Sequence, residues 1–381
     1  MNIDLRRKNI LDSSRKIVIK IGTRVLTAEN GKLDEKRIEN LVKGISLLRK
    51  NRKETVIVTS GAIGAGMGKL GILKRPKDIP QKQALAAIGQ SELMHVYEKY
   101  FKEEGVNVGQ MLLTQDDLID RKRFLNASNT LNNLLNFNAV PIINENDTIA
   151  IDEIKFGDND NLSVQVSNLV HADLLLILTS TDGLFSADPR RYERAELIPV
   201  VEKIDAVIEK IAGTNIDETS IGGMHTKIQA AKKAVKSGVG VIIANGNKRD
   251  IISRIFSYEE EGTFFLPQKN KMTCRKKWIA FSSKSKGIIT VDKGAYLALM
   301  DKGKSLLPSG ITKLSGKFKI GDRVIVASID NQEFACGLVN YNYEDLEKIK
   351  GKNTDDIKNI LGYKDYDEVI HRDNLVLLKD F

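Results

Sequence analysis

Residues 16–23 read KIVIKIGT, an apolar, β-branched run that ends at a lysine and a glycine. Four comparable runs follow along the chain: TVIVT at 55–59, VPIIN at 140–144, LLLILT at 174–179 and VGVIIA at 239–244. Short apolar runs bounded by turn residues are typical of strands that are buried on both faces of a parallel sheet. The segment between the first two runs places apolar residues at the spacing of one helix face: Ile38, Leu41, Val42, Ile45 and Leu48. This alternation predicts an α/β sandwich with a mainly parallel central sheet.

The pattern changes after Pro267. Residues 268–277 read QKNKMTCRKK, which is polar, basic and without period, and short apolar runs rich in glycine and lysine follow. We therefore expect a first domain over residues 1–266, a linker over 267–280 and a small β-rich domain over 281–381.

The composition is that of an ordinary globular protein, with 41% hydrophobic and 29% charged residues in a chain of 381. No apolar stretch is long enough for a membrane span, and the start, MNIDLRRKNI, lacks the apolar core of a signal peptide. The sequence therefore predicts a cytoplasmic protein. The two cysteines, Cys274 and Cys336, form no CxxC pair, which argues against a disulfide framework or a structural zinc site.

The formal net charge of +9 suits either a nucleic-acid binder or an enzyme that attracts anionic substrates. Residues 281–381 carry 16 Lys/Arg against 15 Asp/Glu, so most of the excess lies in the first 280 residues. The charge therefore does not mark the C-terminal module as an RNA binder. Within that module, however, residues 281–323 hold 9 basic against 3 acidic residues. An RNA-binding protein acting through this module remains an alternative function.

Polar and glycine-rich residues follow the expected strands, at the edge where ligands bind to parallel sheets. Lys20 and Gly22 end the first strand, and the glycine-rich stretch SGAIGAG follows the second at 60–66. Glycine lets backbone N–H groups approach an anion, but a bare turn would look the same. The clusters NEND at 144–147 and FGDNDN at 156–161 are denser in polar groups than a solvated loop requires.

The simpler interpretation of these clusters is an Asx-turn and a helix N-cap, with Asp160 capping a helix that starts near Asn161. Their carboxylates could instead orient lysines, coordinate Mg²⁺ or bind a substrate ammonium group. The stretch IGGMHTK at 221–227 opens a further helix and could grip a phosphate, although a lone lysine such as Lys227 is usually solvated.

The chain resembles the glutamate 5-kinase family, within the amino-acid kinase superfamily. The resemblance rests on six motifs in the order of that family: VIKIGTRVLT, VTSGAIGAG, PIINENDTIA, FGDNDNLS, GLFSADPR and GGMHTK. The motifs lie within residues 16–246, and GGMxTK is shared more widely among amino-acid kinases. Beyond residue 280 the chain is similar to a PUA domain, through GIITVDKGAYLALM, SLLPSGITKLSGKFKIGDRVIV and IHRDNLVLL.

The resemblance implies an ATP-dependent kinase that phosphorylates the γ-carboxylate of L-glutamate to glutamyl 5-phosphate, the first step of proline biosynthesis. Lys20 and Lys227 would neutralise the transferring phosphoryl group, and Asp160 would hold both lysines. Ser60, Asp147 and Asn159 would bind glutamate, with Asp147 suited to its ammonium group. The implied ATP contacts are Lys20, Thr179, Ser180, Ile221, Gly222, Gly223, Met224, His225, Thr226 and Lys227.

The resemblance also implies Mg²⁺ carried mainly by the ATP phosphates rather than by a protein metal site, free proline as a feedback inhibitor, and a homo-oligomer. One departure is visible, because Thr179-Ser180-Thr181-Asp182 stands where Thr-Asp is expected. Either Ser180 or Asp182 could therefore take the nucleotide contact. The remaining alternative is a sister kinase for aspartate, N-acetylglutamate or a nucleotide. Asp147 discriminates against an N-acetylated substrate, which has no ammonium group to bind.

Overall fold

The structure is a computed structural model that describes residues 4–28, 31–149, 159–189, 191–213, 223–268, 279 and 285–378. The chain divides into two compact units, Met1–Lys271 and Met272–Phe381, each with its own hydrophobic core. No helix among the described residues is both long and apolar enough to cross a lipid bilayer.

The first unit is built on an eight-stranded sheet in the order β3-β4-β2-β1-β5-β7-β8-β6. Its strands are β1 (Lys16–Ile21), β2 (Glu54–Thr59), β3 (Val108–Leu113), β4 (Val140–Glu145), β5 (Leu174–Thr179), β6 (Val200–Val201), β7 (Gly240–Asn245) and β8 (Thr263–Phe265). All pairings are parallel except that of β7 with β8. The expected mainly parallel sheet is confirmed, and each of the five expected strands lies within one residue of its expected bounds.

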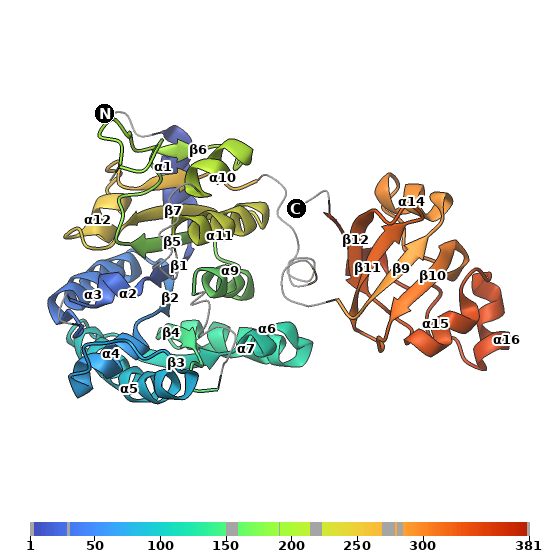
Figure 1. The fold of residues 1–381 in the computed structure, drawn as a ribbon, viewed down its shortest axis with the longest axis horizontal. Coiled ribbons are helices and arrows are strands. Elements are labelled where there is room, and N and C mark those ends of the chain that lie inside the picture. The colour runs from blue at the N-terminus through green and yellow to red at the C-terminus, as the bar shows by residue number, and fades with distance from the viewer. Residues whose placement is uncertain are drawn as a thin grey trace. The chain divides into compact units, whose positions relative to one another are not determined.

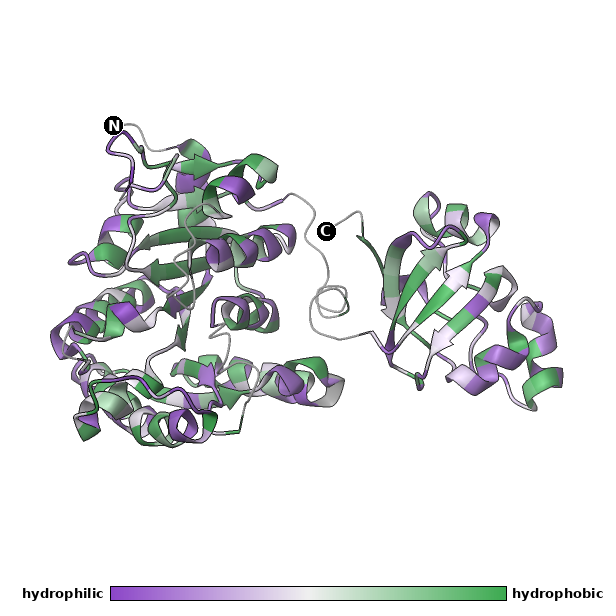
Figure 2. Cartoon of the chain, in the orientation of Figure 1, coloured by the Kyte–Doolittle hydropathy of each residue, from purple (hydrophilic) through white to green (hydrophobic). Residues whose placement is uncertain are grey.

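Helices cover both faces of this sheet (Figure 1), with α3, α4, α5 and α12 on one face and α7, α9 and α11 on the other. The helices of the unit are α1 (Leu5–Ser13), α2 (Thr23–Leu26), α3 (Glu35–Lys50), α4 (Ala62–Leu70), α5 (Ile79–Glu103), α6 (Gln115–Ile119), α7 (Arg121–Asn136), α9 (Asn159–Val170), α10 (Ala206–Gly213), α11 (Met224–Lys236) and α12 (Ile251–Phe256). Figure 2 shows β5 and β7 as largely hydrophobic strands, whereas α3 and α11 are partly hydrophilic, as expected for helices with one face in solvent.

Helix α3 shows how the sequence pattern produces this packing. Asp34 accepts a hydrogen bond from the backbone N–H of Arg37 at 3.1 Å and so caps the first turn. The five apolar residues that the helical spacing selected are all buried: Ile38, Leu41, Val42, Ile45 and Leu48. They join the apolar side chains of the sheet in one core cluster.

The glycine-rich stretch at 60–66 after β2 leads into a helix and is itself mostly helical, because α4 already begins at Ala62. Only Gly61 precedes α4 as its N-cap, with a φ of 98° that favours glycine. A Cβ on Gly66 would lie 2.1 Å from the backbone oxygen of Leu85, and one on Gly89 would lie 1.8 Å from that of Ala62. The glycines therefore allow α4 and α5 to pack with their backbones in contact.

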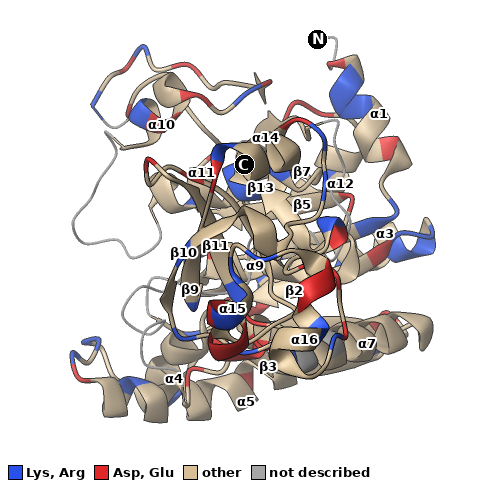
Figure 3. Cartoon of the chain, turned by 90° about the vertical axis from the view of Figure 1, so that its right-hand side faces the viewer, with Lys and Arg blue, Asp and Glu red and all other residues tan. Residues whose placement is uncertain are grey.

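The second unit is β-rich, as expected. Its five-stranded sheet has the order β10-β9-β11-β12-β13. The strands are β9 (Gly287–Val291), β10 (Ile311–Gly316), β11 (Arg323–Ser328), β12 (Glu333–Leu338) and β13 (Leu375–Leu377), and the helices are α14 (Lys293–Met300), α15 (Tyr343–Ile349) and α16 (Ile357–Leu361). Figure 3 shows both signs of charge on α15. Cys336 is a free, buried thiol whose pKa is raised by burial.

Candidate active site

The carboxyl ends of β4, β2, β1, β5 and β7 lie along the same edge of the sheet because these strands are parallel. Ligands of open α/β sheets bind beyond that edge. The central strand β1 lies between β2 and β5 and carries Lys20 near its end. Residues after β2 and β4 therefore lie on one side of Lys20, and residues after β5 and β7 on the other.

Two buried lysines meet one buried carboxylate at the centre of this edge. Asp160, in the first turn of α9, is 3% exposed. Its Oδ1 lies 2.7 Å from Lys20 Nζ, and its Oδ2 lies 3.1 Å from Lys227 Nζ. The three residues come from β1, α9 and α11, so only the folded sheet brings them together. The contacts expected of Asp160 are present. The expected N-cap is not, because α9 already begins at Asn159.

Among the described residues, the ammonium groups of Lys20 and Lys227 both face the carboxylate of Asp160. Burial by itself would raise the pKa of Asp160, but Lys20 and Lys227 outweigh burial and hold that pKa well below its usual range. Asp160 therefore stays ionised. Two ammonium groups held close together suit an anion such as a phosphoryl group.

The start of α11 adds a hydroxyl to the same carboxylate. Thr226 Oγ1 donates to Asp160 Oδ2 at 3.0 Å. Gly223 is the N-cap of α11 and offers no side chain there, while Met224 is half-buried and His225 is exposed. Ile221 and Gly222, which are expected to contact ATP, lie outside the described residues.

A chain of side-chain amides extends from this centre toward β2 and β4. Asn159 is 8% exposed, and its Nδ2 lies 2.9 Å from Ser60 Oγ and 2.6 Å from the backbone oxygen of Thr59. The same Nδ2 lies 2.9 Å from Asn144 Oδ1. Two residues expected to bind glutamate, Ser60 and Asn159, are thus in direct contact.

The far end of this chain is Gln90 of α5, which the motifs did not identify. Asn144 Nδ2 donates to Gln90 Oε1 at 2.8 Å, and Gln90 is 8% exposed. The one sequence signal for Gln90 is a polar residue on an apolar helix face, among Leu85, Ala86 and Leu93. Gln90 fixes the amide of Asn144 and, through it, the amide of Asn159.

Asp147, the third residue expected to bind glutamate, lies half-buried in the turn that follows β4. The backbone N–H of Asn146 donates to the backbone oxygen of Leu113 at 3.0 Å, which ties this turn to the end of β3. Asp147 is therefore at the same edge as Ser60 and on the same side of Lys20.

The residues expected to contact ATP after β5 lie on the opposite side of Lys20. Thr179 ends β5, and its backbone oxygen accepts from the N–H of Gly246, just after β7, at 2.8 Å. Ser180 follows and is half-buried. The residues expected to bind glutamate thus fall on one side of Lys20, and the expected ATP residues after β5 fall on the other.

The described residues contain no group of three or more His, Cys, Asp or Glu side chains arranged to hold a metal ion. Both oxygens of Asp160 already face lysines.

Comparisons with known proteins identify the family to which each unit is similar. The amino acid kinase family matches residues 15–245, and the PUA domain matches residues 287–361. A glutamate 5-kinase from Caldanaerobacter subterraneus subsp. tengcongensis is 55% identical over 364 residues, which cover 96% of this chain and 98% of that protein. A glutamate 5-kinase from Syntrophus aciditrophicus is 48% identical over 373 residues, 98% of this chain and 97% of its own length.

Among solved structures, UMP kinase from Bacillus anthracis matches with a TM-score of 0.45 and 17% identity, over 66% of this chain and 96% of its own. So distant a likeness says nothing about substrate. The family model spans most of the first unit, and the relatives span nearly the whole chain. This chain therefore belongs to the amino acid kinase family and, within it, to the glutamate 5-kinases.

Proposed function

We propose that this chain transfers the terminal phosphoryl group of ATP to the γ-carboxylate of L-glutamate, giving glutamyl 5-phosphate for proline biosynthesis. The observation that carries the proposal is the 55% identity to a curated glutamate 5-kinase over 96% of the chain. The geometry supports it, because Lys20 lies between the residues expected to bind glutamate and those after β5 expected to bind ATP, and Asp160 joins Lys20 to Lys227.

The chemical problem is electrostatic. A glutamate side chain has a reference pKa of about 4.3, so the nucleophile is ionised at neutral pH and needs no general base. Attack on a phosphate brings two anions together, and catalysis of phosphoryl transfer consists mainly of positioning and charge neutralisation. Lys20 and Lys227 would supply the positive charge, and Asp160 would hold their ammonium groups at fixed positions.

Glutamate would bind beside β2 and β4. Ser60 and Asn159 would form hydrogen bonds with the polar groups of glutamate. The amide contacts from Asn159 through Asn144 to Gln90 would fix the orientation of the two side chains. Asp147 would pair with the substrate ammonium group. The first N–H groups of α4, which have no partner within the helix itself, would suit a substrate carboxylate.

ATP would bind from the β5 side, with its phosphates at the two lysines and at the start of α11. Mg²⁺ would be held mainly by the ATP phosphates and would lower their negative charge. Thr179, Ser180 and the stretch from Ile221 to Lys227 would contact the nucleotide.

Regulation and assembly extend the proposal. Proline carries an ammonium and a carboxylate group like those of glutamate, so free proline would inhibit from the glutamate side. The enzyme would act as a homo-oligomer.

A substrate panel tests the proposal. The purified chain is given ATP and Mg²⁺ with L-glutamate, L-aspartate, N-acetyl-L-glutamate or UMP, and ADP release is measured. Hydroxylamine is added in parallel to convert an acyl phosphate into a coloured hydroxamate. We expect ADP and hydroxamate in equal amounts with glutamate and little of either with the other acceptors. A preference for another acceptor, or ADP without hydroxamate, would overturn the assignment.

A further inference from the structure

The turn after β5 is fixed from two directions. The backbone N–H of Leu184 donates to Thr263 Oγ1 of β8 at 2.8 Å, and Thr263 is fully buried. Gly183 has a φ of 148°, and a Cβ there would lie 2.6 Å from the same Oγ1. With Thr179 bonded to Gly246 at the start of the turn, the backbone of Asp182 has little freedom.

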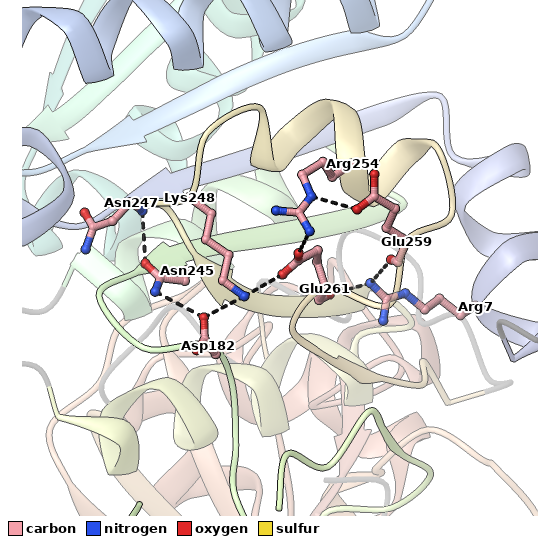
Figure 4. Close-up of polar contacts among 8 residues, drawn as sticks. All are labelled: Arg7, Asp182, Asn245, Asn247, Lys248, Arg254, Glu259 and Glu261. Atoms are coloured by element: carbon pink, nitrogen blue, oxygen red, sulfur yellow. Dashed lines mark hydrogen bonds and ion pairs between the residues drawn. The ribbon is translucent and has the colours of Figure 1, made fainter. Parts of the chain in front are cut away.

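The carboxylate of Asp182 is held by one oxygen only. Its Oδ1 accepts from Asn245 Nδ2 at 3.1 Å and lies 2.9 Å from Lys248 Nζ (Figure 4). For Oδ2, no hydrogen bond or ion pair exists within the described part of the chain, and the side chain is 40% exposed. Burial by itself would raise the pKa of Asp182, and the hydrogen bonds from Lys248 and Asn245 lower it. Asp182 therefore presents an ionised, oriented acceptor.

Lys248 is in turn held by a buried carboxylate. Its Nζ lies 2.9 Å from Glu261 Oε2, and Glu261 is 6% exposed. The other oxygen of Glu261 pairs with Arg254, on the side away from Lys248 (Figure 4). The backbone oxygen of Glu261 accepts from Arg7, a fully buried arginine of α1. The network therefore anchors Lys248 and, through it, Asp182.

The location limits what Asp182 can recognise. Asp182 and Lys248 follow β5 and β7, on the proposed ATP side, and β7 lies two strand spacings, roughly 10 Å, from β1. A triphosphate bound at the lysines would extend along this direction, so the nucleoside would lie near these strands. A carboxylate repels phosphate and accepts from neutral O–H and N–H donors. A nucleoside offers such donors in its ribose hydroxyls and in the amino group of adenine.

We propose that Asp182 binds the ribose hydroxyls of ATP through Oδ2, and that Lys248 and Glu261 are positioning residues for this contact. The inference rests on the proposed function, since it assumes that ATP lies across β5 and β7. Asp182, rather than Ser180, then supplies the carboxylate that contacts the nucleotide after β5.

Deoxynucleotides test the contact directly. KM is measured for ATP, 2′-deoxy-ATP and 3′-deoxy-ATP with the full chain and with Asp182→Asn, at saturating glutamate. A hydrogen bond to a charged acceptor discriminates by about 10-fold or more. We expect the parent to show such a ratio for at least one deoxynucleotide, and Asp182→Asn to reduce it to about 2-fold. The KM for glutamate should not change.

Lys248→Met tests the positioning role. It should reduce the same discrimination by raising the KM for ATP, and Lys248→Arg should restore part of the discrimination. Arg254→Gln is the matched control, because it removes the other partner of Glu261 without touching Asp182. Its discrimination should remain at the parent level even if its thermal unfolding midpoint falls.

Inosine triphosphate, which lacks the amino group of adenine, separates the two donors. If Asp182→Asn changes the ratio for inosine triphosphate but not for the deoxynucleotides, the contact is to the base and the ribose assignment is wrong. Unchanged ratios for all three nucleotides would also overturn it. Failure of the proposed function would look different, because the parent would then release no ADP with glutamate.

Discussion

At the scale of single residues, Lys227 departs most from what its residue type alone would predict. A lone lysine in a helix is usually solvated, yet Lys227 is 5% exposed and faces Asp160. Lys227 was identified as a candidate site residue because it lies in the GGMxTK motif, and no local pattern around it indicated burial. Asp160 and Lys227 are 67 residues apart, so their contact has no local sequence signal.

The first prediction concerns the removal of this charge. Lys227→Met keeps most of the buried chain and removes the ammonium, and Asp160 retains Lys20 as a partner. We expect kcat to fall about 100-fold or more, the range found when a single transition-state donor is removed. Thermal unfolding of the variant confirms that it is folded, and steady-state ADP release measures kcat. A folded variant with kcat within a few-fold of the parent would exclude Lys227 from phosphoryl transfer.

Asp147 gives the second prediction. Asp147→Asn keeps the size of the side chain and removes the charge that would face the substrate ammonium. We expect the KM for glutamate to rise by about 10-fold or more and the KM for ATP to change little, because only the glutamate contact is weakened. Glutarate, which lacks the ammonium group, is the control ligand. Asp147→Asn should affect its use much less, and equal effects on glutamate and glutarate would exclude the pairing.

At the scale of elements, the sequence predicted the buried strands well and the exposed or short ones poorly. Strand β3 reads VGQMLL and lies at the edge of the sheet. It is only partly buried there, so its sequence is not a continuous apolar run. Strands β6 and β8 have two and three residues, too few for a periodic pattern. The strand ends gave the locations of Lys20, Ser60 and Thr179.

The site residues that the sequence did not predict are those whose contacts depend on packing between elements. Gln90 reaches Asn144 only because α5 packs beside the sheet. Glu261 holds Lys248 only because β8 returns antiparallel to β7. Neither residue belongs to a motif, and each would be read alone as an ordinary polar side chain.

The packing of α4 on α5 gives the third prediction. Gly89→Ala would place a methyl group 1.8 Å from the backbone oxygen of Ala62 and 2.3 Å from the nitrogen of Gly66, so the two helices must separate. We expect the free energy of unfolding to fall by about 1–3 kcal/mol, as in overpacked cores. Activity should fall too, because α4 begins beside Ser60. Gly213→Ala is the control, since among the described residues no atom beyond its chain neighbours and its own helix backbone lies within 4 Å of the added methyl group. Equal stabilities of the two variants in urea would contradict the packing argument.

At the scale of the whole molecule, the fourth prediction concerns regulation. Proline would compete for the glutamate side of the site. We expect millimolar proline to lower the initial rate and saturating glutamate to relieve the inhibition. The measurement is ADP release over a matrix of proline and glutamate concentrations, with D-proline as the control for stereospecific binding. No effect of proline, or inhibition that persists undiminished at saturating glutamate, would contradict a shared site.

The fifth prediction tests the division of the chain. Each unit has its own core, since the first cluster contains no residue beyond Phe264 and the second none before Ile289. All proposed site residues lie between Lys20 and Glu261, and residues 271–277 read KMTCRKK, a sequence with several trypsin sites. We expect brief trypsin treatment to cut there and release two compact fragments.

A chain of residues 1–270 should then phosphorylate glutamate with a kcat within a few-fold of the parent, because no proposed contact to either substrate comes from the second unit. The isolated fragment is compared with the nicked, unseparated digest, which controls for loss of assembly. A folded 1–270 fragment without glutamate-dependent ADP release would place essential groups in the C-terminal unit.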